Sequence, residues 1–282
     1  MIEKLMVIGA GTMGHGIAQV AAQAGFDVVL EDVSADFVSR GISRIEENLK
    51  KGVERGKVTD TEMRAALSRI RTSTDINDAA AADLVIEAVI EKLDAKRELL
   101  AELDRICKPA AILATNTSSL SIASIASATA RADRVIGMHF FNPVHIMKLI
   151  EVVIAAETSE GTLSAALDVA RRMGKEAITV KDAPGFATSR LGVALGLEAM
   201  RMLEQEVASA EDIDKAMVLG YNHPMGPLRL TDLVGLDIRL NIAEYLFGEL
   251  NSEAFRPPEI LKRKVAEGKL GKKTGEGFYR WE

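Results

Sequence analysis

The chain has 282 residues, of which 48% are hydrophobic and 27% charged, and its net charge is −6 at pH 7. These values are typical of a globular protein with one large or two moderate cores and argue against a nucleic-acid partner. The single cysteine, Cys107, excludes an internal disulfide and favours a reducing compartment, so we expect a cytoplasmic location. No apolar run reaches the roughly 18 residues of a membrane span, and neither a membrane partner nor a metal site is expected.

The first residues predict a site for a dinucleotide. Residues 5–8 have the continuous apolar pattern of a buried parallel strand, and a helix is expected from about residue 12 to 24. Gly9, Gly11 and Gly14 between them form the pattern G-x-G-x-x-G. The first glycine allows a tight turn, the second lets the backbone approach a pyrophosphate, and the third lets the helix pack closely. The phosphates are expected on the helix N-terminus, at Thr12 and Met13.

An acidic residue follows the second predicted strand, residues 28–30. Asp32 stands 18 residues after Gly14, where its carboxylate can accept hydrogen bonds from the adenosine ribose. The carboxylate would repel a 2′-phosphate, and no Lys or Arg stands directly after it. The sequence therefore predicts NAD rather than NADP as the cofactor.

Residues 34–68 are polar with apolar positions at helical spacing, and a crossover helix need not be this long. We expect the segment to project as a helical pair. It carries a basic cluster, for which two interpretations stay open. The cluster is either a solvated face or a clamp on a phosphorylated substrate. Its members are Lys50, Lys51, Arg55 and Lys57.

Further strands are expected at 70–75, 84–89 and 111–115, with an amphipathic helix from Glu91 to Cys107. In an open parallel sheet, ligands bind at the carboxyl ends of the strands. Glu91 and the turn 116–119 are therefore expected near the reactive end of the cofactor. The alternative is that the turn residues cap helices, and for Ser118 the two interpretations are equally open.

Residues 135–141 and 147–154 predict two strands joined by a turn at Asn142-Pro143. If they pair antiparallel about position 145, His139 and Glu151 face each other with their Cβ atoms ~5 Å apart. A carboxylate there can hold one imidazole nitrogen and leave the other to move a proton. The residues alone leave two interpretations open, a catalytic pair or a histidine satisfied by its neighbours.

A helix at 160–173 and a strand at 176–180 complete the first domain, expected at 1–183. Residues 184–282 have helical patterns only, with helices at about 187–207, 211–219, 228–234, 236–250 and 258–267. The predicted fold is therefore α/β, a Rossmann-like, mostly parallel sheet with antiparallel strands added at one edge, followed by an all-α domain. The first of these helices has more apolar residues than one surface face needs, and this predicts a homodimer. They are Leu191, Val193, Leu195, Leu197, Met200 and Leu203.

Over essentially its whole length the chain resembles the 3-hydroxyacyl-CoA dehydrogenase family. The motifs that carry the resemblance are specific only together. They are Gly9-x-Gly11-x-x-Gly14, Asp83-Leu-Val-Ile-Glu87-Ala, Glu91 with Lys96, Thr115-Asn116-Thr117-Ser118-Ser119, His139-Phe-Phe-Asn142-Pro143, Glu151, Asp182-x-Pro184-Gly185-Phe186 and Gly275-x-Gly277-Phe278-Tyr279.

The resemblance implies a Rossmann-like NAD domain, a helical C-terminal domain that dimerises, and a role in fatty-acid metabolism such as β-oxidation. It implies that His139 and Glu151 form the catalytic dyad and that Ser118 and Asn142 contact the substrate. It also implies NAD contacts from Glu91, Lys96, Asn116 and Ser118, and it favours Lys50, Lys51 and Arg55 as a clamp for coenzyme A.

One position departs from the family. The family motif Pro-Gly-Phe-x-x-Asn-Arg here has Ser189 in place of Asn. This puts the details of substrate binding in doubt more than the reaction, and we expect the Ser189 hydroxyl to reach the substrate directly or through water. The expected reaction is the reversible NAD-dependent oxidation of a (3S)-3-hydroxyacyl-CoA, with 3-hydroxybutyryl-CoA as substrate. The alternatives are a dehydrogenase of a free hydroxy acid and a catalytically silent NAD-binding relative.

Overall fold

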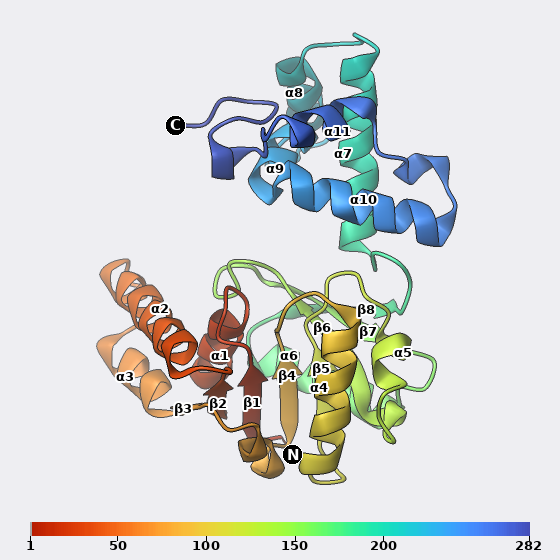
Figure 1. Ribbon diagram of the computed structural model, residues 1–282. Coiled ribbons are helices and arrows are strands. Elements are labelled where there is room, and N and C mark those ends of the chain that lie inside the picture. Colours follow the sequence, from red (N-terminus) through yellow and green to blue (C-terminus); the bar gives the residue numbers. More distant parts are fainter. Residues whose placement is uncertain (1) are drawn as a thin grey trace. The chain divides into compact units, whose positions relative to one another are not determined.

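The chain divides into two units, Met1–Ala183 and Pro184–Glu282, and the computed structural model describes residues 2–282. The N-terminal unit is built on one sheet, whose strand order is β3-β2-β1-β4-β5-β6-β7-β8 (Figure 1). Neighbouring strands run parallel except β6 and β7, which pair antiparallel. The predicted fold class is therefore confirmed. The strands are β1 (Lys4–Ile8), β2 (Asp27–Glu31), β3 (Ile70–Ser73), β4 (Leu84–Glu87), β5 (Ile112–Thr115), β6 (Val135–Phe140), β7 (Leu149–Ile154) and β8 (Glu176–Lys181).

The central strands are almost completely buried, as expected for parallel strands covered on both faces. Every residue of β4 and β5 is buried, and in β1 only Lys4 is exposed. The helices of this unit pack on the sheet through amphipathic faces. They are α1 (Gly14–Gln23), α2 (Ala35–Glu54), α3 (Asp60–Ser68), α4 (Leu93–Ile106), α5 (Ile122–Ala126) and α6 (Glu160–Arg172).

The helices α2 and α3 form the expected helical pair beside β3 (Figure 1). Local signals set where each one begins. The Ser34 side chain caps α2 by accepting a hydrogen bond from the backbone N–H of Phe37. Thr59 and Glu62 form a reciprocal capping box at the start of α3.

The C-terminal unit is helical and has its own core. Its helices are α7 (Thr188–Glu204), α8 (Ala210–Gly220), α9 (Pro227–Val234), α10 (Leu236–Leu250) and α11 (Glu259–Ala266). Three of the six apolar residues that predicted a dimer face on α7 lie instead in the core of their own unit. Val193, Leu197 and Met200 are 0% exposed there, so this part of the prediction is wrong. Of the six apolar residues offered for a dimer face, Leu191 remains strongly exposed, at 71%.

The glycine-rich tail folds back on this same unit and is held by one buried carboxylate. Asp232, 1% exposed, accepts hydrogen bonds from the backbone N–H groups of Phe278 and Tyr279 at 2.8 and 2.9 Å. It also accepts one from the indole N–H of Trp281 at 2.8 Å. A Cβ at Gly277 would lie 2.3 Å from Asp232 Oδ1, so only glycine fits there.

Candidate active site

The three glycines after β1 have three different geometries. Gly9 has φ +95°, a conformation that favours glycine. A Cβ at Gly14 would lie 1.6 Å from the carbonyl oxygen of Gly9, so α1 can pack this close to the turn only with glycine there. A Cβ at Gly11 would meet no heavy atom within 4 Å. Space is therefore open above the Gly11 backbone, as close approach of a pyrophosphate requires.

Asp32 helps to fix this turn. Its Oδ2 accepts the backbone N–H of Ala10 at 2.7 Å, and its Oδ1 accepts that of Val33 at 2.8 Å. The N–H of Gly9 donates to the carbonyl of Glu31 at 2.8 Å. The acid at the end of β2 is thus held next to the glycine turn, where a ribose hydroxyl pair can reach it.

A pocket of about 700 Å³ opens at the carboxyl ends of β1, β2 and β4. Its size suits the adenosine part of a dinucleotide. Three of its lining residues, all from α2, were not anticipated from the sequence. Arg40 lies over the ring of Phe37, 4.7 Å from its centroid, and Arg44 lines the pocket one turn further on. The full lining is Ile8 to Met13, Glu31 to Val33, Phe37, Arg40, Arg44 and Ala88 to Ile90.

Glu31 is one of the residues that line this pocket and is 5% exposed. Burial raises the pKa of this carboxyl to about 7, and the negative charges of Asp32, Asp75 and Glu102 add to the rise. Glu31, which directly precedes Asp32 in the chain, therefore holds a proton below neutral pH.

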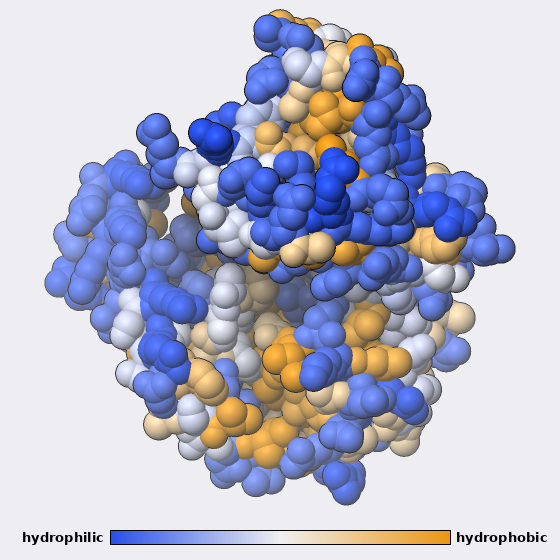
Figure 2. Space-filling view, turned by 45° about the horizontal axis from the view of Figure 1, so that its top comes forward, coloured by the Kyte–Doolittle hydropathy of each residue, from blue (hydrophilic) through white to orange (hydrophobic). Residues whose placement is uncertain are grey.

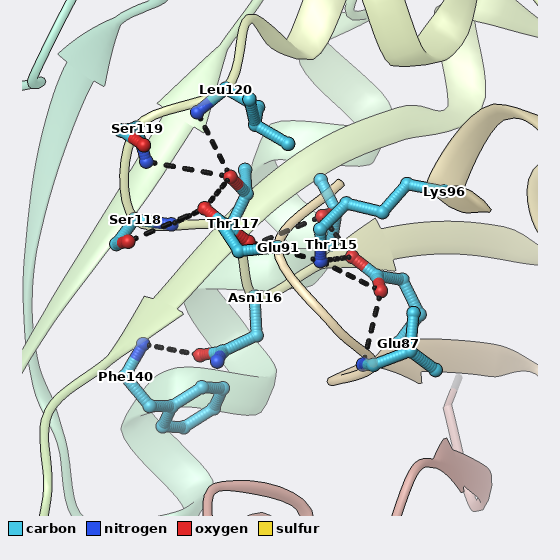
Figure 3. Close-up of polar contacts among 11 residues, drawn as sticks. Glu87, Glu91, Lys96, Thr115, Asn116, Thr117, Ser118, Ser119, Leu120 and Phe140 are labelled. Atoms are coloured by element: carbon cyan, nitrogen blue, oxygen red, sulfur yellow. Dashed lines mark hydrogen bonds and ion pairs between the residues drawn. The ribbon is translucent and has the colours of Figure 1, made fainter. Parts of the chain in front are cut away.

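A buried ion pair lies at the ends of β4 and β5 (Figure 3). Lys96, on α4, donates to both carboxylate oxygens of Glu87 at 2.7 and 2.9 Å, and the two side chains are 1% and 0% exposed. The hydroxyl of Thr115 also donates to Glu87. Lys96 lies 3.3 Å from the carboxylate of Glu91, so one ammonium group links both acids.

Glu91 in turn holds the turn that follows β5. Its Oε1 accepts the hydroxyl of Thr117 at 2.5 Å, the backbone N–H of Ser118 at 2.8 Å and the Ser118 hydroxyl at 3.3 Å. Asn116 links the same turn to the next strand, since its Oδ1 accepts the backbone N–H of Phe140 at 2.9 Å (Figure 3). Lys96, Glu91 and Ser118 therefore belong to one connected network, and Asn116 ties the same turn to β6. The sequence placed Glu91 and this turn only at the same edge of the sheet.

The structure confirms the prediction that His139 and Glu151 face each other on neighbouring strands. The two residues are directly opposed in the antiparallel ladder of β6 and β7. His139 Nδ1 lies 2.7 Å from Glu151 Oε2, and the residues are 7% and 0% exposed. Phe141 packs against the imidazole, with the ring centroids 4.5 Å apart. A carboxylate in this position fixes the orientation of the ring.

The other candidates lie on three elements. Asn142 is exposed two residues after the end of β6, and Lys50, Lys51 and Arg55 are exposed along the end of α2. Lys51 forms an ion pair with Glu47 at 2.7 Å. Ser189 lies in the first turn of α7, in the C-terminal unit. Within residues 2–282, no three His, Cys, Asp or Glu side chains gather as a metal site requires.

A glycine turn at the end of β1, an acid at the end of β2 and a carboxylate–histidine pair on the same sheet define a Rossmann-type, nucleotide-dependent oxidoreductase. The comparison with protein families makes this specific. Residues 4–183 match the NAD binding domain of 3-hydroxyacyl-CoA dehydrogenase, and residues 185–281 match its C-terminal domain. The chain belongs to the 3-hydroxyacyl-CoA dehydrogenase family.

Relatives are similar over nearly the whole chain. A 3-hydroxybutyryl-CoA dehydrogenase of Mycobacterium tuberculosis is 44% identical over 282 residues, covering 99% of both chains. The human mitochondrial hydroxyacyl-coenzyme A dehydrogenase is 45% identical, covering 100% of this chain and 92% of its own. The crystal structure of the (S)-3-hydroxybutyryl-CoA dehydrogenase from Ralstonia eutropha matches with a TM-score of 0.97 and 42% identity, covering 100% of both chains.

The family assignment confirms the predicted cofactor, NAD, and the predicted class of reaction. The protein is an NAD-dependent oxidoreductase that acts on 3-hydroxyacyl-CoA. None of the helices among residues 2–282 has both the length and the apolar character to cross a bilayer.

Proposed function

We propose that this enzyme oxidises short-chain (3S)-3-hydroxyacyl-CoA, with 3-hydroxybutyryl-CoA as its substrate, and that His139 and Glu151 are its catalytic dyad. The proposed length of the acyl chain rests on the relatives that are called 3-hydroxybutyryl-CoA dehydrogenases. The catalytic assignment rests on one observation, the buried 2.7 Å contact between His139 Nδ1 and Glu151 Oε2. A role in fatty-acid β-oxidation in the cytoplasm fits this chemistry and the single, buried cysteine.

In the proposed mechanism the two nitrogens of the His139 imidazole have different roles. Glu151 holds Nδ1, so Nε2 is the atom that removes the proton from the C3 hydroxyl. The carboxylate of Glu151 then stabilises the imidazolium that forms. NAD, when bound, supplies the hydride chemistry, and the glycine turn and Asp32 are the residues that would hold it. In the reverse direction Nε2 returns the proton to the substrate oxygen.

Ser118 and Asn142 are proposed to orient the substrate at His139. Ser118 follows β5, where Glu91 binds its backbone N–H and its hydroxyl. Asn142 follows β6, three residues after His139. Both side chains offer hydrogen-bond donors and acceptors for a polarised carbonyl or hydroxyl.

Kinetics of dyad variants test this proposal. His139→Ala should lower kcat by about 10²–10⁴-fold, the range of general base catalysis. Glu151→Gln should lower kcat strongly and leave the Kd for NAD nearly unchanged, because the charge and orientation of the imidazole are lost rather than the cofactor site. The exposed Glu157→Gln serves as a matched control. Near-normal kcat in His139→Ala would show that the dyad is not the base.

Lys50, Lys51 and Arg55 are proposed to bind the phosphates of coenzyme A. All three are exposed near the end of α2, as a clamp for a solvent-exposed phosphate requires. Neutralising them should raise KM for acyl-CoA with little change in kcat, the pattern of lost uniform binding. The effect should weaken with salt, because screening acts over ~8–10 Å at physiological ionic strength. If KM for acyl-CoA is unchanged in these variants at low salt, the cluster does not bind the substrate and is only a solvated face.

Ser189 is proposed to bind the substrate in place of the Asn of the family. A neutral hydrogen bond is worth about 0.5–1.5 kcal/mol, so Ser189→Ala should lower kcat/KM by roughly 2- to 12-fold. Ser189→Asn is the companion variant. It should keep or raise activity if the pocket has room for the longer side chain, and it should worsen KM if the pocket has closed around Ser. Wild-type kinetics in Ser189→Ala would remove this residue from the site.

A homodimer formed by the C-terminal unit is also proposed. Hydrophobic side chains reach the surface of the molecule between hydrophilic ones (Figure 2). In the C-terminal unit, Leu191, Leu219 and Tyr221 are 71%, 77% and 76% exposed. A contiguous patch of exposed apolar side chains is typical of a surface that binds a partner, and we propose that these three residues contribute to one. Sedimentation at micromolar concentration should give the mass of a dimer, and a monomer would contradict this.

A further inference from the structure

Four basic side chains beside the start of α1 have no part in the mechanism given above. All belong to the N-terminal unit, Met1–Ala183. His15 is on α1 and Arg44 on α2, whereas His145 lies in the connection between β6 and β7 and Lys175 directly precedes β8. We call these four residues the histidine cluster, because the packing of their elements brings them together.

The connection between β6 and β7 packs directly on α1. A Cβ at Gly16 would lie 2.9 Å from the Cβ of Val144, which is 2% exposed. The neighbours of these two residues in the chain are His15 and His145. Burial lowers the pKa of His145, and the positive charges of His15 and Lys175 lower it further. The two imidazoles are therefore close enough for their charges to interact.

Helix α2 brings an arginine to the same place. Gln19, one turn after His15, accepts a hydrogen bond from the Asn48 side chain at 3.2 Å. Arg44 lies one turn before Asn48 on the same side of α2, and therefore near His15. Burial lowers the pKa of His15, the carbonyl of Gly11 opposes this, and the charge of Arg44 lowers it further.

Lys175 completes the cluster. Its ammonium donates to the carbonyl oxygens of Val144 and Met147, the second at 2.8 Å, so it lies beside His145. These bonds use two of its three N–H groups. Among residues 2–282, the charged groups that shift the pKa of the two imidazoles are all positive. Like charges held this close favour a bound anion.

The tautomer of His15 leaves one ring nitrogen for a ligand. Nδ1 lies 2.6 Å from the carbonyl oxygen of Gly11, which can only accept a hydrogen bond. Nδ1 therefore carries a hydrogen, and Nε2 is the nitrogen that gains a proton. A neutral Nε2 presents a lone pair to an anion and repels it, whereas a protonated Nε2 donates a charge-assisted hydrogen bond.

The histidine cluster connects two parts of the proposed coenzyme A site. Arg44 precedes Lys51 by seven residues and Arg55 by eleven, so the three share one face of α2. At the other side of the cluster, His145 follows Asn142 by three residues. The cluster thus extends from the phosphate clamp on α2 to the connection that carries a residue proposed to orient the substrate.

We propose that the histidine cluster binds the diphosphate of acyl-CoA and that its imidazoles take up protons as the substrate binds. This inference rests on the proposed function, because it extends the coenzyme A clamp of α2. The diphosphate of NAD fits the cluster less well. The open backbone at Gly11 already suits that group, and His145 and Lys175 belong with the connection that carries Asn142.

The inference makes acyl-CoA binding depend on pH. A bound diphosphate raises the pKa of both imidazoles above the lowered values of the free enzyme. The extra affinity is therefore fully present below the free-enzyme pKa values and is lost as pH rises through those of the complex.

Calorimetric titration of the wild-type enzyme with 3′-dephospho-CoA tests this. The diphosphate of this probe keeps its charge between about pH 6 and pH 8, whereas the 3′-phosphate of CoA titrates there. Its Kd should be about 3- to 30-fold lower at pH 6 than at pH 8, as for a charge-assisted hydrogen bond weakened by solvent. Titrations in two buffers of different ionisation enthalpy should show proton uptake. A Kd independent of pH, or binding without proton uptake, would overturn the inference.

Variants locate the proton. His15→Gln/His145→Gln removes both protonation sites and keeps polar side chains. Its Kd should differ by less than about 2-fold between the two pH values, without proton uptake, and each single variant should lose part of the effect. His223→Gln, in the C-terminal unit, is the matched control and should behave as the wild type. Wild-type pH dependence in folded histidine variants would show that the proton binds elsewhere and that the inference is wrong.

Titration with NAD distinguishes the other source of a diphosphate. The double variant should bind NAD as the wild type does at both pH values. If it changes the pH dependence for NAD and not for 3′-dephospho-CoA, the bound diphosphate is that of the cofactor and the inference is wrong. Failure of the proposed clamp has a different signature. Neutralising Lys50, Lys51 and Arg55 would then leave KM for acyl-CoA unchanged, while proton uptake with 3′-dephospho-CoA would persist.

Discussion

Replacement of Lys96 by Met should destabilise the N-terminal unit more than the loss of an ordinary ion pair. Lys96 donates two hydrogen bonds to Glu87, at 2.7 and 2.9 Å, and the two side chains are 1% and 0% exposed. Without the ammonium, a fully buried carboxylate keeps the Thr115 hydroxyl and a 3.3 Å contact with the N–H of Val89. These neutral donors do not compensate its charge.

Breaking a buried pair by removing one partner costs about 3–5 kcal/mol. For a unit of this size, 1 kcal/mol corresponds to roughly 2–4 °C, so the melting temperature should fall by about 6–20 °C. Calorimetry is the suitable assay because it can resolve separate transitions of the two units. Arg171→Met, which breaks the exposed pair of Arg171 with Asp168, is the control and should cost no more than about 1 kcal/mol.

The double variant Glu87→Gln/Lys96→Met tests the reason for the effect. It removes both charges, so a large part of the lost stability should return. Lys96→Met should also raise the Kd for NAD, since Glu91, which holds the Ser118 turn, loses its cationic neighbour at 3.3 Å. Two results would refute the reasoning: a single variant within about 1 kcal/mol of wild type, or a double variant as unstable as the single one.

Three further predictions concern acidic residues. Asp32→Ala should reduce the preference for NAD over NADP in kcat/KM, because the carboxylate that repels a 2′-phosphate is gone, and equal use of both cofactors by the wild type would contradict this. Partial burial of Asp83 opposes its ionisation, but hydrogen bonds from Lys108 and from two backbone N–H groups outweigh this and lower its pKa from 3.8 to about 2. Asp83→Asn should therefore cost about 1–2 kcal/mol at pH 7, after allowance for solvent screening, and this cost should disappear as the pH falls through the folded-state pKa in urea unfolding experiments. The pKa of Glu31 is raised from 4.5 to about 7, so the folded state holds a proton that the unfolded state releases and stability falls as pH rises through this interval. Glu31→Gln should be more stable than wild type above pH 7 and similar to it below pH 4.5, and equal stability at both ends would contradict the shift.

The sequence determined those features that depend on neighbours along the chain. The glycine pattern and Asp32 follow from local strand–turn–helix signals. The pairing of His139 with Glu151 follows from two apolar strands and the proline turn between them, because an antiparallel hairpin fixes which residues face each other. Family motifs added the reaction, which no local pattern defines.

The tertiary structure alone decided contacts between residues that lie far apart or on different elements. Lys96 and Glu87 become a buried pair because α4 returns across the end of β4. Arg40 reaches the cofactor pocket because α2 packs beside the glycine turn. The sequence pattern of α10 marks its helical period but does not say that Arg239 lies against Gly192 and Gly196 of α7, with its Nε unpaired among residues 2–282. Burial and pairing of a charge depend on which surfaces the fold brings together, and helix or strand periodicity carries no information about those partners.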